Sequence, residues 1–122
     1  MTVRSFVRAV PALLVLCAWS TGGWAHAACK RGDPAPGAVI NEAPTRISLQ
    51  CDSALEMAFS QVLVEDANGK QVDKGGLQGD PKDPKHLILP LPPLEPGTYK
   101  VIWSVVARDG HRTKGNYQFT IR

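Results

Sequence analysis

The chain has 122 residues, of which 43% are hydrophobic and 20% charged, with a formal net charge of +3. This length supports one small domain with a modest core. The positive residues are spread out, without a basic stripe or interleaved aromatic residues, so the composition argues against a nucleic-acid-binding protein.

Residues 1–25 have the three parts of a secretory signal peptide. A positively charged start is followed by the apolar run Val10–Trp19, and the small residues Gly23 and Ala25 precede a cleavage site before His26. The apolar run is shorter than the roughly 20 residues that a lasting membrane anchor needs, and no later segment approaches that length. We therefore expect export, cleavage before His26 and no stable membrane insertion.

Two other processing routes fit the same residues. Ala25-His26-Ala27 is itself a small-x-small motif, so a cut after Ala27 would remove His26. Acylation of Cys29 is a weaker alternative, because His26 stands where a lipobox has leucine or a similar residue. We favour the cut before His26 because it creates a chelating amino terminus. It also removes two of the 14 basic residues, which leaves 12 against 11 acidic ones in the mature domain, 26–122.

The cysteine content agrees with export. Cys17 leaves with the leader, and Cys29 and Cys51 remain as an even pair in an oxidising compartment. We expect a disulfide between them, which the chain-entropy model values at roughly 3 kcal/mol. Two buried free thiols and a thiolate metal site are the alternatives that the residues alone leave open.

The mature chain is typical of short strands separated by proline and glycine. Alternating apolar residues predict strands over 45–51, 60–65, 86–91, 99–106 and 116–121. Between them we expect a loop over 33–37, a loop or short helix over 53–59, an Asn-Gly hairpin turn over 66–69 and a polar loop over 80–85. Leu94 to Tyr99 resembles a tyrosine corner, in which a tyrosine hydroxyl ties a crossover loop to the next strand. Six or seven strands in so short a chain predict an all-β, Greek-key β-sandwich.

Asp109-Gly110-His111 and the mature amino terminus are the candidate metal ligands. Side chains at i and i+2 of an extended segment share a side, so Asp109 and His111 can face one metal. His26 would add its α-amine and ring Nδ1 as a chelate. Three nitrogens and one oxygen in a plane suit Cu(II). Taken alone, the spacing favours an Asp-Gly turn and a solvated surface histidine over a metal site.

From His26 to the end, the chain resembles the CopC family of periplasmic copper-binding proteins (the CopC/PcoC domain). The family opens on His-Ala, followed by a Pro-Ala-x-Gly loop and an Ala-Pro step, as in His26-Ala27, 34–37 and 43–44. A Leu-x-Pro-Gly-x-Tyr-x-Val-x-Trp segment and an Asp-x-His-x-x-x-Gly-x-Tyr-x-Phe ending match 94–103 and 109–119. The resemblance implies a seven-stranded, Ig-like or cupredoxin-like fold with Cu(II) held by His26, Asp109 and His111.

Three departures from the family pattern bear on the copper site. Cys51-Asp52-Ser53 replaces the usual Phe-Ser-Glu, so the nearby acidic side chain is lost or shifted to Asp52. Arg108 adds a positive charge where the family usually has serine before its Asp-x-His pair. The methionine-rich Cu(I) loop of some members is absent, since the mature chain has only Met57. We therefore expect one Cu(II) site and no methionine Cu(I) site.

These features favour a monomeric periplasmic Cu(II) carrier that is not an enzyme, and the resemblance suggests a CopD-like inner-membrane copper transport protein as its partner. A copper oxygenase with a histidine brace is less favoured, because Asp109 and His111 would fill the positions where oxygen must bind. An Ig-like interaction module without metal becomes the better interpretation if cleavage follows Ala27. His86 is expected to be a solvated residue at a strand start.

Overall fold

The computed structural model describes Thr2 and residues 28–122. The strands are β1 (Cys29–Asp33), β2 (Val39–Ile40), β3 (Arg46–Cys51), β4 (Gln61–Glu65), β5 (Gln78–Asp80), β6 (Asp83–Pro90), β7 (Gly97–Val106) and β8 (Arg112–Ile121), and a short 3-10 helix, η1, spans Met57–Phe59. No helix among the described residues is long and apolar enough to cross a membrane.

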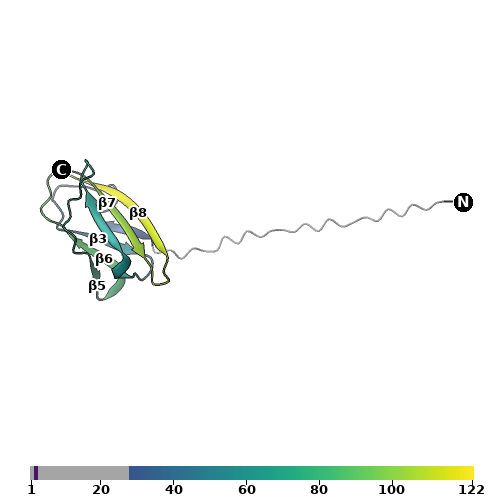
Figure 1. The fold of residues 1–122 in the computed structure, drawn as a ribbon. Helices are drawn as coiled ribbons and strands as arrows, with labels where there is room; N and C mark the ends of the chain where they lie inside the picture. The colour runs from purple at the N-terminus through teal and green to yellow at the C-terminus, as the bar shows by residue number, and fades with distance from the viewer. Residues whose placement is uncertain (1, 3–27) are drawn as a thin grey trace.

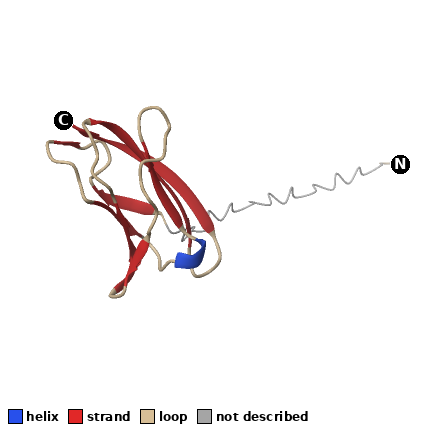
Figure 2. Cartoon of the chain, turned by 60° about the vertical axis from the view of Figure 1, so that its left-hand side comes forward, coloured by secondary structure: helices blue, strands red, loops and turns tan. Residues whose placement is uncertain are grey.

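Two four-stranded sheets form the domain. Their strand orders are β1-β3-β6-β5 and β2-β8-β7-β4, and every pairing is antiparallel except that of β2 with β8 (Figure 1). Figure 2 shows the two layers of strands, with η1 at one end of them. The all-β, two-sheet prediction is confirmed. The described residues form eight strands rather than the seven that the resemblance implied.

The core follows the predicted alternation. In β3, β4, β7 and the second half of β6 every second side chain points between the sheets and is buried, which leaves the intervening residues mostly on the outer faces. The largest fully buried side chains are Phe119, Ile47, Leu49, Leu87, Leu89, Val64, Val101 and Val105. The burial of these side chains from both sheets stabilises the sandwich through the hydrophobic effect.

Two local predictions at loops are confirmed. The Tyr99 hydroxyl donates a hydrogen bond of 2.6 Å to the Glu95 carbonyl, as a tyrosine corner requires. Gly69 takes a positive φ of 79° in the turn after β4, and Val72 N–H then donates to the Val64 carbonyl. The segment 53–59 is a loop that ends in η1, as expected.

One loop prediction is wrong. Residues 80–85 are not a polar loop, because Asp80 and Asp83 pair across a tight turn that joins β5 to β6. The carboxylates of these two residues accept the backbone N–H groups of Lys82 and Lys85, each at 2.9 Å. Asp-x-Lys turns of this kind satisfy the backbone locally, so polar residues and prolines are compatible with a strand that begins at Asp83.

Candidate metal centre

The β7–β8 hairpin ends in a tight turn that carries Asp109 and His111. Ala107 N–H donates to the His111 carbonyl at 3.0 Å, and Gly110 N–H donates to the Ala107 carbonyl at 2.9 Å. Gly110 has a φ of 91°, in the left-handed region where a Cβ is unfavourable. The premise of an extended segment at 109–111 is therefore wrong, since the chain reverses here.

The turn nevertheless brings the two side chains together. His111 Nδ1 lies 3.1 Å from Asp109 Oδ2, and His111 N–H donates to Asp109 Oδ1 at 3.0 Å. The carboxylate thus holds both the backbone and the ring of His111. The side chains are 51% exposed for Asp109 and 62% for His111, so an ion from solvent can reach them.

Backbone hydrogen bonds gather three segments at this end of the domain. Asp52 N–H donates to the Ala28 carbonyl at 3.0 Å, and Arg108 N–H donates to the Ala54 carbonyl at 3.1 Å. Leu55 forms an isolated antiparallel bridge with Ala107. The start of the domain, the segment after β3 and the turn with Asp109 are therefore connected in series through their backbones.

His26 lies outside the described residues, so its predicted place at the metal is not tested. Within residues 28–122 no group of three or more histidine, cysteine or acidic side chains could hold a metal ion. Asp109 and His111 form a pair that needs further ligands to make a copper site.

The Asp52 side chain lies next to the start of the domain. Its carboxylate forms an ion pair of 3.4 Å with Lys30, and both side chains are largely exposed. A surface pair of this kind contributes little to stability.

The predicted disulfide between Cys29 and Cys51 is present. The two residues are opposite each other in the β1–β3 pairing, and both are buried. The alternatives of two free thiols or a thiolate metal site are therefore excluded. The bridge attaches the first described strand to the end of β3, one residue before Asp52, and so restrains the place from which the amino-terminal segment departs.

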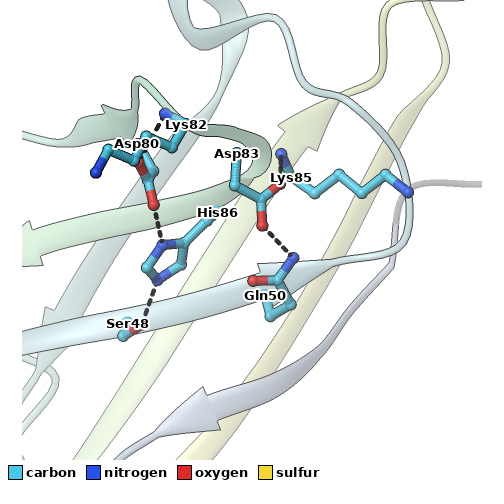
Figure 3. Close-up of polar contacts among 7 residues, drawn as sticks. All are labelled: Ser48, Gln50, Asp80, Lys82, Asp83, Lys85 and His86. Atoms are coloured by element: carbon cyan, nitrogen blue, oxygen red, sulfur yellow. Dashed lines mark hydrogen bonds and ion pairs between the residues drawn. The ribbon is translucent and has the colours of Figure 1, made fainter.

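The prediction that His86 is solvated is wrong. Its side chain is only 22% exposed, because it lies between Asp80 of β5 and Ser48 of β3 (Figure 3). Nδ1 is 3.1 Å from Asp80 Oδ2, and Nε2 is hydrogen-bonded to Ser48 Oγ. The neighbouring Gln50 donates through Nε2 to Asp83 Oδ2 at 3.1 Å. A local sequence pattern does not reveal this cluster, because Ser48 and His86 are 38 residues apart.

The CopC domain family model matches residues 29–122. Protein YobA of Escherichia coli strain K12 is 35% identical over 122 residues, which cover 99% of this chain and 98% of that protein.

Two solved structures are similar over most of the described domain. CopC from Methylosinus trichosporium OB3b has a TM-score of 0.75 and 30% identity, covering 79% of this chain and 93% of that one. PcoC, a methionine-rich copper resistance protein from Escherichia coli, has a TM-score of 0.70 and 30% identity, covering 80% of this chain and 100% of that one.

Proposed function

Because the chain belongs to the CopC domain family, we propose that it binds one Cu(II) ion after export to the periplasm, with His26, Asp109 and His111 as ligands. The observation that carries this proposal is the Asp109–His111 pair, held by an Nδ1–Oδ2 contact of 3.1 Å on an exposed turn. The similar proteins described as CopC and as a copper resistance protein support copper as the metal.

Donor chemistry supports Cu(II) rather than a hard or a soft cation. An amine and two imidazole nitrogens with one carboxylate oxygen are typical of a tetragonal Cu(II) site. Because Nδ1 of His111 contacts Asp109 Oδ2, a metal held by both residues would have to replace this contact.

The position of the first described residues supports a role for His26. Ala28 is hydrogen-bonded to Asp52. Ala54, two residues further along the same segment, is hydrogen-bonded to Arg108 in the 107–111 turn. His26 precedes Ala28 by two residues, a span of at most about 7 Å in extended chain. A cleaved terminus at His26 would thus start near the end of the domain that carries Asp109 and His111.

The proposed role is that of a monomeric copper carrier rather than an enzyme. Four protein donors in the plane leave no equatorial position for oxygen, whereas catalytic metals need an open position. We propose that copper passes to a CopD-like inner-membrane transport protein. Size-exclusion chromatography of the copper-loaded protein should give a single species of monomer size, and a stable dimer would contradict this part of the proposal.

Substitution of His111 tests the site directly. We expect His111→Ala to lower the Cu(II) affinity at least about tenfold and to change the EPR spectrum, because one equatorial nitrogen is lost. His86→Ala is the matched control, since it removes a histidine outside the proposed site and should keep the parent's spectrum and affinity. Unchanged copper binding by His111→Ala would overturn the assignment.

The processing site is tested by intact-mass analysis of protein exported to the periplasm. We expect a chain that begins at His26 and binds one equivalent of Cu(II), with affinity falling as the pH drops below the ordinary pKa of an α-amine, about 8. A chain that begins at Ala28 would remove the chelating terminus and favour an interaction module without metal.

A further inference from the structure

Ser48, His86 and Asp80 form a hydrogen-bonded series on the outer face of the β1-β3-β6-β5 sheet (Figure 3). Asp80 Oδ2 contacts His86 Nδ1 at 3.1 Å, and His86 Nε2 contacts Ser48 Oγ. The three residues come from three adjacent strands, β3, β6 and β5. This order of hydroxyl, imidazole and carboxylate is the arrangement in which a base activates a serine and a third group orients the base.

For a neutral His86 ring, the contacts indicate which nitrogen carries the proton. An ionised carboxylate can only accept hydrogen bonds, so His86 Nδ1 must donate to Asp80. In the neutral ring Nε2 is then the acceptor, and the Ser48 hydroxyl donates to it. Asp80 remains ionised, because the Lys82 backbone N–H and then the His86 ring lower the pKa of its carboxyl below the ordinary value.

Asp80 is also held in place independently of His86. Its second oxygen, Oδ1, accepts the Lys82 backbone N–H at 2.9 Å in the β5–β6 turn. One carboxylate oxygen is therefore tied to the backbone and the other to the imidazole. Such an arrangement keeps the ring in one tautomer and one orientation.

From this geometry we propose that Ser48 is an activated nucleophile that accepts an acyl or phosphonyl group from a small activated electrophile. His86 is its general base and Asp80 is the positioning residue. Ser48 Oγ attacks the electrophilic carbon or phosphorus while the hydroxyl proton passes to His86 Nε2. The bond to the leaving group breaks, the leaving group departs with its electron pair, and His86 releases the proton to water.

The surroundings predict one addition rather than turnover. Ser48 lies in a central strand, paired with Asp33 of β1 on one side and Ile88 of β6 on the other. These ladders use the backbone N–H groups that would otherwise form an oxyanion hole, a feature worth about 10²–10³-fold in rate. The adduct on Ser48 is thus expected to accumulate, because its hydrolysis needs the same stabilisation.

The limited exposure of the series defines the class of electrophile. Ser48 and the 22% exposed His86 are both partly buried, so the reagent that reaches the Ser48 hydroxyl must be compact. Ser48 does not line the cavity of about 290 Å³ beside Asp80 and His86, so that cavity does not position the reagent. Fluorophosphonates and activated esters of short acids belong to this class.

The experiment uses an alkyl fluorophosphonate on the full exported protein, with the adduct located by peptide mass mapping. In this reagent Ser48 displaces fluoride from phosphorus. We expect one adduct per chain at Ser48 and none at Ser60, whose hydroxyl donates to the Glu56 carbonyl and accepts from Val106 N–H without any base. His86→Gln should slow labelling by about 10²-fold or more.

Asp80→Asn separates positioning from simple support of the fold. Its amide can donate to Nδ1, which would place the proton on Nε2 and remove the base, so a loss of about 10²-fold or more is expected there as well. Circular dichroism and the midpoint of urea unfolding show whether each variant is folded. Asp83→Asn, on the same turn but bonded to Gln50, is the matched control and should label at the parent rate.

Equal labelling of Ser48 and Ser60, or parent rates in folded His86→Gln and Asp80→Asn, would overturn the proposal. Ser48→Ala should abolish the adduct while it leaves Cu(II) binding unchanged. Failure of the nucleophile proposal is thus distinguishable from failure of the copper proposal.

Discussion

Tyr117 carries a hydroxyl whose hydrogen-bonding capacity is not satisfied. Its hydroxyl is buried and has no hydrogen-bond partner among the residues that the structure describes. It lies directly against Gly32 of the opposite sheet, where a Cβ would overlap the phenol oxygen. Burial, and then the Asp33 carboxylate, raise the pKa of Tyr117 well above its ordinary value of 10.0.

We predict that Tyr117→Phe does not lower the free energy of unfolding at neutral pH. An unpaired buried hydroxyl costs about 1–3 kcal/mol, so removing it is neutral or stabilising. Tyr99→Phe is the matched control, because its hydroxyl bond to the Glu95 carbonyl is lost, and it should cost about 1 kcal/mol. Urea unfolding at pH 7 compares the three proteins, and an equal loss in both variants would contradict the interpretation.

The same substitution should change the alkaline behaviour. Because the folded-state pKa of Tyr117 is raised, ionisation of this phenol favours the unfolded state. The free energy of unfolding is therefore unaffected by this group below the ordinary pKa of 10.0 and falls as the pH rises above it. The parent should therefore lose more stability than Tyr117→Phe between pH 9 and about pH 11. Parallel stability curves would show that the buried phenol does not contribute.

The β7–β8 hairpin is the longest paired element and supports the turn with Asp109 and His111. Its ten pairs run from Gly97–Ile121 to Val106–Arg112 without interruption. Within it Trp103 is opposite Gly115, and the buried indole occupies the space where a Cβ on Gly115 would lie. The hairpin therefore depends on a glycine at this position for close packing rather than for a special backbone conformation.

We predict that Gly115→Ala destabilises the fold by about 1–3 kcal/mol, because the rigid indole of Trp103 cannot move without disturbing the core. The matched control is Gly79→Ala, where the new Cβ would meet the flexible Met57 side chain at 3.2 Å. The control should cost less. Thermal or urea unfolding followed by tryptophan fluorescence measures both, and a larger loss in Gly79→Ala would contradict the packing argument.

At the scale of the whole molecule, the Cys29–Cys51 bridge connects the beginning of the domain to the sandwich. Apart from this bridge, β1 is an edge strand that pairs only with β3 in its sheet. The hydrogen bond from Asp52 N–H to the Ala28 carbonyl lies next to the bridge. The disulfide thus affects both the stability of the fold and the position of the proposed copper-binding terminus.

Reduction should lower the free energy of unfolding by roughly 3 kcal/mol, through the greater chain entropy of the unfolded state. It should also weaken Cu(II) binding, because the amino-terminal segment is no longer restrained. Urea unfolding with and without dithiothreitol measures the first effect. Copper titration of a Cys29→Ala/Cys51→Ala variant without reductant measures the second, because dithiothreitol itself reduces and binds Cu(II). In urea unfolding the same variant is the control and should not respond to the reductant. Two free thiols in the unreduced protein would contradict the prediction.

The strands of the core were predictable from residues alone. In 45–51, 60–65 and 99–106 buried and outward residues alternate with the period of a strand, and the structure confirms all three as β3, β4 and β7. Because burial of one face stabilises such segments, the alternation among neighbouring residues is enough to predict them. The Asp109–His111 pair was also predictable, because both residues belong to one short motif, although the turn that joins them was not.

The remaining features depend on tertiary structure. The short strands β1, β2 and β5 have five, two and three residues, and pairing to longer neighbours rather than their own pattern creates them. The Ser48–His86–Asp80 series likewise exists only because β3, β6 and β5 are adjacent in register. Periodicity and motif spacing are properties of neighbouring residues, so the sequence by itself determined the core strands and the candidate copper ligands. Contacts across 38 residues require the folded sheet, which alone decided where His86 lies and what it contacts.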